Sequence, residues 1–246
     1  MSEKKIALIT GANRGIGFET ARQLGQQGIT VLLGARDAEK GKAAAETLRA
    51  EGIDAEFVRL DVDDAATRAA ARKQIEEKYG RLDILINNAG VMLDERENGA
   101  IQPPSRTSAE VFRRTFETNF FNVVALTQEF LPLVKKAAAG RIVFLSSILG
   151  SLALHADPAS PIYDFKVPAY DISKTALNGY VVHLAHELRE TPVKVNAAHP
   201  GSVLTEMNAY GELTVEEGAK TSVDLATLSP RGYNGKLIHL GQELPW

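Results

Sequence analysis

The chain has no cysteine among its 246 residues. Without cysteine it can form no disulfide, has no thiolate nucleophile and offers no sulfur ligand to zinc, so its chemistry must come from other side chains. The histidines do not replace the missing ligands. His183 and His186 lie three positions apart in a predicted helix, but no third ligand is spaced to complete a metal site. We therefore assign no metal.

A basic excess and a long apolar run are also missing. The chain has 28 Lys and Arg against 31 Asp and Glu, a formal net charge of -3, whereas a nucleic-acid or anionic-membrane partner would require a basic face. The most apolar candidate segment, around Phe120 to Val134, is broken by Asn122, Gln128 and Glu129, so no run reaches the roughly 18 residues of a membrane span. Ile6 to Ile9 is too short for a signal peptide. We expect a cytoplasmic protein with a small-molecule partner, and neither a nucleic-acid nor a membrane partner.

Short β-rich runs alternate with longer runs of helical period, which is typical of βαβ units. The composition is 44% hydrophobic, and no linker or repeat divides the chain. We predict an α/β fold in a single domain, residues 1–246: a doubly wound parallel sheet of seven strands with helices on both faces. The strands are expected near Ile6–Ile9, Thr30–Leu33, Glu56–Leu60, Ile84–Ile86, Ile142–Leu145, Val193–Ala197 and Leu237–Leu240. The helices are expected near Ile16–Gln27, Ala38–Ala50, Ala65–Tyr79, Ala109–Lys136, Ala169–Arg189 and Val215–Thr227.

A glycine-rich turn follows the first predicted strand and precedes the first helix. Glycine permits a tight turn and a close approach of backbone to ligand, and a helix N-terminus offers free N–H groups and a positive dipole to a phosphate. A turn without a ligand is the alternative, but strand before and helix after is the context that a dinucleotide site requires. The expected cofactor contacts are Gly11, Asn13, Arg14, Gly15, Ile16 and Gly17.

The end of the second strand separates NAD sites from NADP sites, because an acid there binds the ribose 2′-hydroxyl but repels a 2′-phosphate. Asp37 has the spacing of such an acid, yet it also suits the N-cap of the next helix, which we favour. Arg36 and Arg14 present two guanidinium groups that suit a 2′-phosphate. We therefore favour NADP(H) over NAD.

Polar residues follow the later strands too. Asp61 and Val62 come after the third strand, where the carboxylate would lie near the adenine amino group or would simply begin a helix. Asn88, Ala89 and Gly90, after the fourth strand, would fix backbone beside the ligand, although Asn and Gly also make ordinary turns. The turn after the sixth strand lies where open α/β sheets bind ligands. It contains Pro200 and Gly201, followed by Val203 and Thr205, although a Pro-Gly turn is also ordinary in structure.

Tyr170 and Lys174 lie four positions apart in a predicted helix, so their side chains project from one face. A free tyrosine titrates near pH ~10. A positive charge about 4 Å away contributes up to about 4 kcal/mol at an effective dielectric of about 20. The spacing thus predicts a lowered pKa for Tyr170 and a role in proton transfer, although such pairs often lie on solvated helix faces. Asn119, within an apolar helix, either bonds backbone or holds a water at the site.

These residues, in this order, resemble the short-chain dehydrogenases/reductases, in the one-domain branch and nearest to the NADPH-dependent carbonyl reductases. The resemblance implies a Rossmann fold with strand order 3-2-1-4-5-6-7 and catalysis by four residues. The match consists of the Thr-Gly-x-x-x-Gly-x-Gly start, Asp61, Asn87-Asn88-Ala89-Gly90, Asn119, Ser146-Ser147, Tyr170-x-x-x-Lys174 and Pro200-Gly201. The implied catalytic residues are Asn119, Ser147, Tyr170 and Lys174.

The resemblance also implies a role for each residue. Tyr170 would exchange a proton with the substrate carbonyl, and Ser147, rather than Ser146, would hydrogen-bond the carbonyl oxygen. Lys174 would lower the pKa of Tyr170 and hold the nicotinamide ribose. Asn119 would keep a water for proton relay. Thr205 and the backbone of residues 200–203 would contact the carboxamide end of the cofactor.

One departure from the family pattern is the interval of 23 residues from Ser147 to Tyr170, longer than in many members. It contains the segment 150–167, a candidate lid in which Tyr163 and Phe165 would contact the substrate; 91–106 is a second long segment. The extra length leaves monomer or homo-oligomer undetermined. We expect hydride transfer between NADPH and a ketone or aldehyde. The alternatives are an NAD-linked alcohol dehydrogenase and a non-catalytic NADP-binding sensor or scaffold.

Overall fold

The computed structural model describes residues 4–246 and is built around a sheet of eight strands in the order β10-β9-β8-β7-β4-β1-β2-β3. Neighbouring strands from β3 to β9 pair in parallel, in the order that the resemblance implies, so the seven expected strands are confirmed. The eighth strand, β10, pairs antiparallel with β9 at the edge and was not expected from the sequence. The strands of this sheet are β1 (Ile6–Thr10), β2 (Thr30–Ala35), β3 (Ala55–Arg59), β4 (Ile84–Asn87), β7 (Arg141–Leu145), β8 (Lys194–Ala198), β9 (Leu237–His239) and β10 (Gln242–Leu244).

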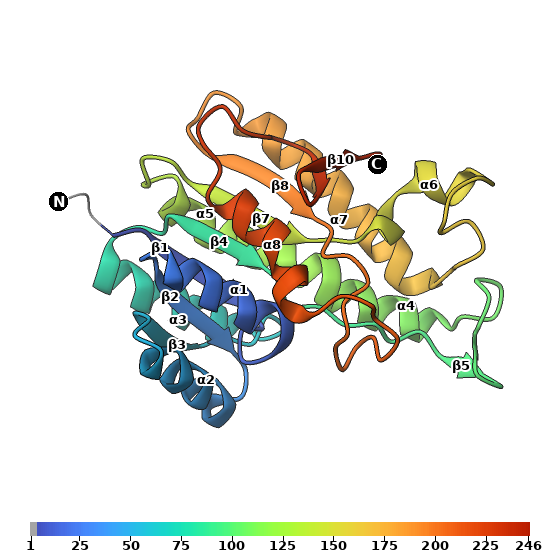
Figure 1. The fold of residues 1–246 in the computed structure, drawn as a ribbon, viewed down its shortest axis with the longest axis horizontal. Helices are drawn as coiled ribbons and strands as arrows, with labels where there is room; N and C mark the ends of the chain where they lie inside the picture. The colour runs from blue at the N-terminus through green and yellow to red at the C-terminus, as the bar shows by residue number, and fades with distance from the viewer. Residues whose placement is uncertain (1–3) are drawn as a thin grey trace.

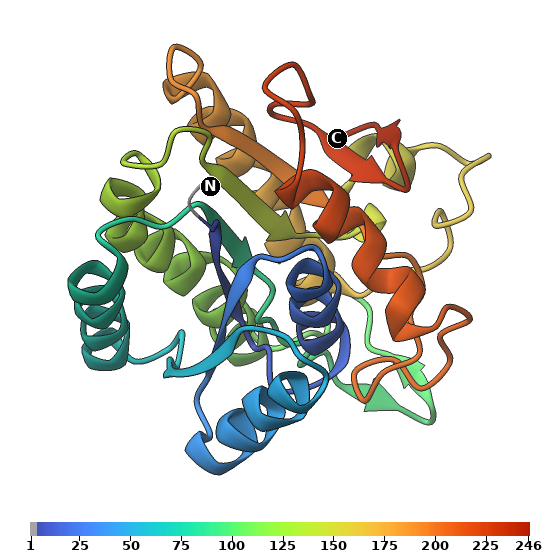
Figure 2. The ribbon, with the colours of Figure 1, turned by 60° about the vertical axis from the view of Figure 1, so that its left-hand side comes forward.

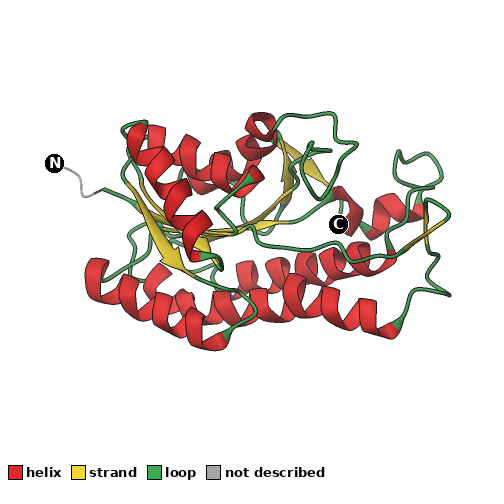
Figure 3. Cartoon of the chain, turned by 90° about the horizontal axis from the view of Figure 1, so that it is seen from below, coloured by secondary structure: helices red, strands yellow, loops and turns green. Residues whose placement is uncertain are grey.

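Helices cover both faces of the sheet, and Figure 3 shows the strands between two helical layers. Alternate residues of a strand point to opposite faces. Leu8 accordingly joins the core formed with α3, α5 and α7, whereas its neighbours Ala7 and Ile9 join the core formed with α1, α2 and α8. The helices are α1 (Gly15–Gln26), α2 (Ala38–Ala50), α3 (Ala65–Tyr79), α4 (Ala109–Phe116), α5 (Asn122–Val134), α6 (Leu152–Ala156), α7 (Pro168–Glu187) and α8 (Val215–Ala226).

Three segments depart from the expected elements. The single helix expected over 109–136 is two helices joined by a π-helical turn, η1 (Glu117–Phe121), which carries Asn119. The segment 91–106 forms a small hairpin of β5 (Arg96–Glu97) and β6 (Ala100–Ile101). The segment 150–167 contains α6, preceded by the short 3-10 helix η2 (Ile148–Gly150). Both segments were expected to be long loops, but one contains a hairpin and the other a short helix.

These two segments and the stretch before α8 gather at one end of the molecule, as Figures 1 and 2 show. It is the end at which the parallel strands present their carboxyl termini. Within residues 4–246, no helix combines the length and the apolar character needed to cross a membrane.

A substitution at Phe144 on β7 tests the hydrophobic core that supports the carboxyl ends of the strands. The Phe144 side chain is fully buried and meets the Tyr180 ring edge-on, with ring centroids 5.8 Å apart. Phe144→Ala should lower the free energy of unfolding by about 3–5 kcal/mol, the usual effect of emptying such a site. Denaturant unfolding measures this, with Phe165→Ala as the control because Phe165 is 51% exposed. Equal losses in the two variants would contradict the assignment of the core.

Candidate active site

Four of the expected site residues come together from three elements. Asn119 lies on η1, Ser147 follows β7, and Tyr170 and Lys174 lie on α7. β4 and β7 are adjacent at the middle of the sheet, and α7 packs against both η1 and η2. The carboxyl end of the central strands therefore meets the first two turns of α7.

The start of α7 is fixed by a residue that the sequence pattern did not indicate. Asp94, in the segment after β4, accepts hydrogen bonds from Ala169 N–H (2.8 Å) and Tyr170 N–H (3.0 Å). A carboxylate at a helix N-terminus satisfies free donors and favours the helix dipole. Since Asp94 precedes Tyr170 by 76 positions, only the folded chain reveals the pairing.

Lys174 is buried and lies beneath Tyr170. Its ammonium donates a hydrogen bond to the Leu145 carbonyl at 2.7 Å and sits 5.5 Å from the centre of the Tyr170 ring. Burial lowers the pKa of Lys174 to about 8, so the group still carries a proton at neutral pH.

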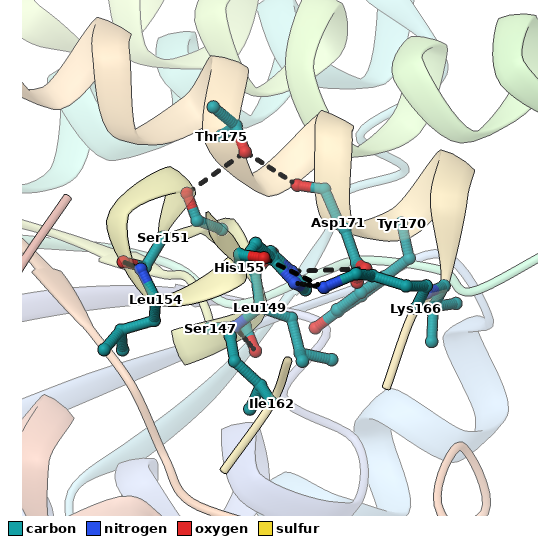
Figure 4. A network of polar contacts seen from close by, with 12 residues as sticks. Ser147, Leu149, Ser151, Leu154, His155, Ile162, Lys166, Tyr170, Asp171 and Thr175 are labelled. Atoms are coloured by element: carbon teal, nitrogen blue, oxygen red, sulfur yellow. Dashed lines mark hydrogen bonds and ion pairs between the residues drawn. The ribbon is translucent and has the colours of Figure 1, made fainter. Parts of the chain in front are cut away.

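The Tyr170 phenol lies beside Ser147, and Figure 4 shows the two side chains directed toward each other. Burial raises the pKa of Tyr170 to about 12, the nearby Asp171 charge adds to the rise, and the Ser147 hydrogen bond opposes it. The expectation of a lowered pKa for Tyr170 was therefore wrong, because burial raises it. That expectation considered one helical neighbour and left out the loss of water around the phenol.

The serine pair divides between two surroundings. Ser147 begins η2 and accepts a hydrogen bond from Leu149 N–H at 3.1 Å, which leaves its hydroxyl facing Tyr170. Ser146 is buried and donates to the Asn178 side chain at 2.6 Å. Only Ser147 reaches the phenol.

Asn119 uses its amide to hold the chain after β4. Its Oδ1 accepts from Val91 N–H at 2.8 Å, while its Nδ2 donates to the Val91 carbonyl at 2.8 Å and to Ser173 Oγ at 3.0 Å. Gly90 lies so close that an added Cβ would come within 3.3 Å of Asn119 Oδ1 and 3.7 Å of Lys174 Nζ. Of the two expected roles of Asn119, bonding the backbone is the one that these contacts display.

Asp63, which the sequence pattern also did not indicate, supports the same turn. Its carboxylate accepts from Thr118 Oγ1 and from Asn122 Nδ2, both at 3.0 Å, and these residues flank Asn119. The preceding residues, Asp61 and Val62, follow β3 as expected. The Asp61 carboxylate accepts from Asp63 N–H at 3.1 Å, and Val62 is buried.

The glycine turn is tied to the end of β4. Thr10 Oγ1 accepts from the N–H groups of Asn88 and Ala89, both at 3.0 Å, and Asn88 Nδ2 donates to the Thr10 carbonyl at 2.8 Å. Gly17 must lack a side chain here, because a Cβ would lie 2.4 Å from Asn88 Nδ2 and 2.7 Å from the Gly11 carbonyl.

The N-terminus of α1 is open toward this turn. No side chain caps it, and its first turn contains no acidic residue. Gly11 and Gly15 have positive φ angles of 64° and 58°, which other residues adopt at a cost. Asn13 and Arg14 lie between them, and Ile16 follows in the first turn of α1. The first N–H groups of the uncapped helix are therefore available for an anion.

The two expected arginines are both exposed, Arg36 directly after β2 and Arg14 at the N-cap of α1. Arg14 forms an ion pair with Glu206 of the segment before α8. Asp37 caps α2 by accepting from the N–H groups of Glu39 (3.0 Å) and Lys40 (3.1 Å). Our choice of a helix cap for Asp37 is confirmed.

The turn after β8 is compact. Gly201 has a φ of 86° and packs so closely that a Cβ would lie 2.4 Å from Leu213. Val203 is buried, and Thr205 lies further along, where its hydroxyl accepts from Asn208 N–H at 3.3 Å. Pro200 and Thr205 are partly exposed at the same edge as the glycine turn.

Comparison with known proteins places these features in a family. The family model for short chain dehydrogenases matches residues 5–215. The chain is 38% identical to short-chain dehydrogenase anuI of Penicillium roqueforti, over 96% of this chain and 94% of that protein. It is 32% identical to mouse carbonyl reductase [NADPH] 1, over 100% and 99%. A short chain dehydrogenase of Escherichia coli CFT073, solved with NADPH, superposes with a TM-score of 0.82 at 28% identity, over 96% of this chain and 95% of that one.

The buried ammonium of Lys174 should make the stability of the protein depend on pH. Burial lowers the pKa of Lys174 from 10.5 to about 8, so in the folded state the charged form is disfavoured. Between these values the unfolded chain binds a proton that the folded chain does not, so Lys174 makes stability rise with pH and its full penalty applies below pH 8. Lys174→Met removes this term, worth up to about 3 kcal/mol.

The free energy of unfolding of Lys174→Met, minus that of the wild type, should therefore fall as the pH rises from about 8 toward 10.5. Urea unfolding at a series of pH values measures the difference. A difference that stays constant over this range would show that the folded state does not perturb the ammonium.

Proposed function

The chain belongs to the short-chain dehydrogenase family, and we propose that it interconverts a ketone or aldehyde and the corresponding alcohol with NADP(H), as a carbonyl reductase or alcohol dehydrogenase. The observation that carries the proposal is the contact of the Tyr170 phenol with Ser147 above the buried Lys174 ammonium. This group of residues lies at the carboxyl end of the central strands, the same end as the glycine turn. The partner is a small carbonyl compound or alcohol, and residues 1–246 act as one dinucleotide-binding and catalytic domain.

NADP(H) is the cofactor that the residues around the glycine turn fit. The uncapped start of α1 suits a pyrophosphate, and the cradle at Gly17 has no room for a side chain. Exposed Arg36 suits a 2′-phosphate, while Asp37 Oδ1 serves as the cap of α2. The mouse reductase named for NADPH and the E. coli relative solved with NADPH support the same choice. When bound, NADPH supplies the hydride.

Tyr170 acts as the general acid during reduction. Its pKa of about 12 keeps the phenol protonated at neutral pH, so a proton is available for the oxygen of the substrate. Ser147 donates a hydrogen bond to that oxygen and stabilises its developing charge. Lys174, protonated and held by the Leu145 carbonyl, stabilises the phenolate that remains after proton donation.

The other residues hold the site in shape. Asn119 fixes Gly90 and Val91 beside Lys174, and Asn88 and Ala89 bind the glycine turn through Thr10. Asp61 and Val62 line the adenine side, and Pro200, Gly201, Val203 and Thr205 the nicotinamide side. The segment 150–167 covers the substrate side, with the half-exposed Tyr163 and Phe165 as apolar contacts.

Tyr170→Phe tests the acid. The phenyl ring keeps its place above Lys174 but has no proton to give, so kcat should fall by at least about 100-fold, the usual share of a general acid. The Kd of NADPH, measured by fluorescence titration, should change little. Tyr79→Phe is the matched control, because its hydroxyl bonds Glu56 at 2.7 Å and has no part in the site. Substantial turnover by Tyr170→Phe would remove Tyr170 from the acid role.

Arg36→Gln tests the choice between NADP and NAD. Losing a charged hydrogen bond to the 2′-phosphate should weaken NADPH binding about 10- to 100-fold, from roughly 1.5–3 kcal/mol. NADH binding should stay the same. Arg189→Gln, an exposed arginine just beyond α7, is the control. Unchanged NADPH binding in Arg36→Gln would favour the NAD-linked alternative.

A further inference from the structure

A second group of ionisable side chains lies on the flank of α7 next to Tyr170. Asp171 Oδ2 is 3.4 Å from His155 Nε2, and His155 Nδ1 is 2.9 Å from Lys166 Nζ. His155 and Lys166 both belong to the segment 150–167, the part of the chain that lengthens the interval between Ser147 and Tyr170. Figure 4 shows the group beside Ser147 and Tyr170.

The partners of His155 decide its protonation state. Nε2 lies 2.9 Å from the Leu149 carbonyl, which can only accept, so Nε2 carries a proton and donates it. Nδ1 faces the Lys166 ammonium, which can only donate, so Nδ1 is unprotonated. His155 is therefore neutral, in agreement with the lowering of its pKa by burial and by Lys166.

Asp171 is 5% exposed and only partly satisfied. Its Oδ2 accepts from Val167 N–H at 2.8 Å, whereas its Oδ1 is buried and, among residues 4–246, has no hydrogen-bond partner. Burial and the nearby Asp94 charge raise the pKa of Asp171 to about 7, and Lys166 acts in the opposite direction. The carboxyl group therefore changes charge in the neutral range, one residue along α7 from the catalytic Tyr170.

We propose that Asp171 is a positioning residue that sets the acidity of Tyr170, and that the segment 150–167 keeps its carboxylate in place and away from water through His155 and Lys166. The proposal rests on the proposed function, in which Tyr170 is the acid. In this proposal, the segment 150–167, which lengthens the interval before Tyr170, has a chemical role. A negative charge held in a dry site acts on its neighbour with little screening.

The sign of the effect follows from the groups that face the phenol. Lys174 lies over the ring, Ser147 faces the hydroxyl, and Asp171, the next residue of α7, acts on Tyr170 through its charge. Asp94, His155 and Lys166 face Asp171 instead. Ionised Asp171 disfavours a phenolate beside it, so it raises the pKa of Tyr170 and keeps the proton on until substrate takes it. Removing the charge should make Tyr170 a stronger acid.

Asp171→Asn removes the charge and keeps an oxygen that can accept from Val167 N–H. The readout is the ionisation of Tyr170, followed by NMR of protein labelled with carbon-13 at the tyrosine ring and assigned with Tyr170→Phe. At a pH about one unit below the wild-type midpoint, the variant should contain roughly two- to tenfold more Tyr170 phenolate. The pH profile of alcohol oxidation should move to lower pH by the amount by which the Tyr170 ionisation midpoint moves. Asp164→Asn, an exposed acid of the same segment, is the control and should change neither.

His155→Ala tests the part played by the segment. Opening the site to water should weaken the action of Asp171, so Asp171→Asn should increase the phenolate less in the His155→Ala background than in the wild type. If Asp171→Asn does not fold, Asp171→Ser keeps a hydroxyl acceptor for Val167 N–H and is expected to behave in the same way.

An unchanged or smaller phenolate fraction in Asp171→Asn would overturn the role of Asp171. An equal increase in both backgrounds would overturn the role of the segment. The NMR readout needs no substrate, so it separates these outcomes from a failure of the proposed function, which would appear as wild-type protein without carbonyl reduction.

Discussion

The hydrogen bond from the Lys174 ammonium to the Leu145 carbonyl is the interaction on which the site depends. It joins the first turns of α7 to the end of β7, and so it brings the Tyr170 ring over Lys174 and its hydroxyl to Ser147. Burying an ammonium is costly, and its lowered pKa of about 8 reflects that cost. The buried charge lies close to the ring on which a phenolate would form, as expected at a functional site.

Around this bond the structure arranges two charges of opposite sign on a single phenol. The Lys174 ammonium lies 5.5 Å from the centre of the Tyr170 ring, Asp171 is the next residue along α7, and both groups are buried. The neighbouring bonds from Thr10 to Asn88 and from Asn119 to Val91 hold the glycine turn and the end of β4 against the same region. The residues proposed for proton transfer and for cofactor binding thus lie together at the carboxyl ends of the central strands, where open α/β sheets place their ligands.

Local patterns in the sequence were enough to predict much of this arrangement. The βαβ alternation yields seven strands, the glycine turn is recognisable by its context, and Asp37 behaves as the helix cap that its position suggests. What local patterns could not show depends on contacts distant in the chain. Asp94 caps a helix 75 positions away, and Asp63 supports the turn around Asn119 from 55 positions away. The pKa of Tyr170 was misjudged for the same reason, because burial is a property of the whole fold.

The central claim is that the site at the carboxyl ends of the central strands catalyses a reaction and does not only bind a nucleotide. Its most direct test is the consumption of NADPH by the purified protein, followed by absorbance, over a panel of chemically varied ketones, aldehydes and quinones. The account predicts that at least one class of carbonyl compound is reduced with stoichiometric oxidation of NADPH. Tight binding of NADPH without oxidation by any compound of the panel would contradict it and favour a sensor or scaffold.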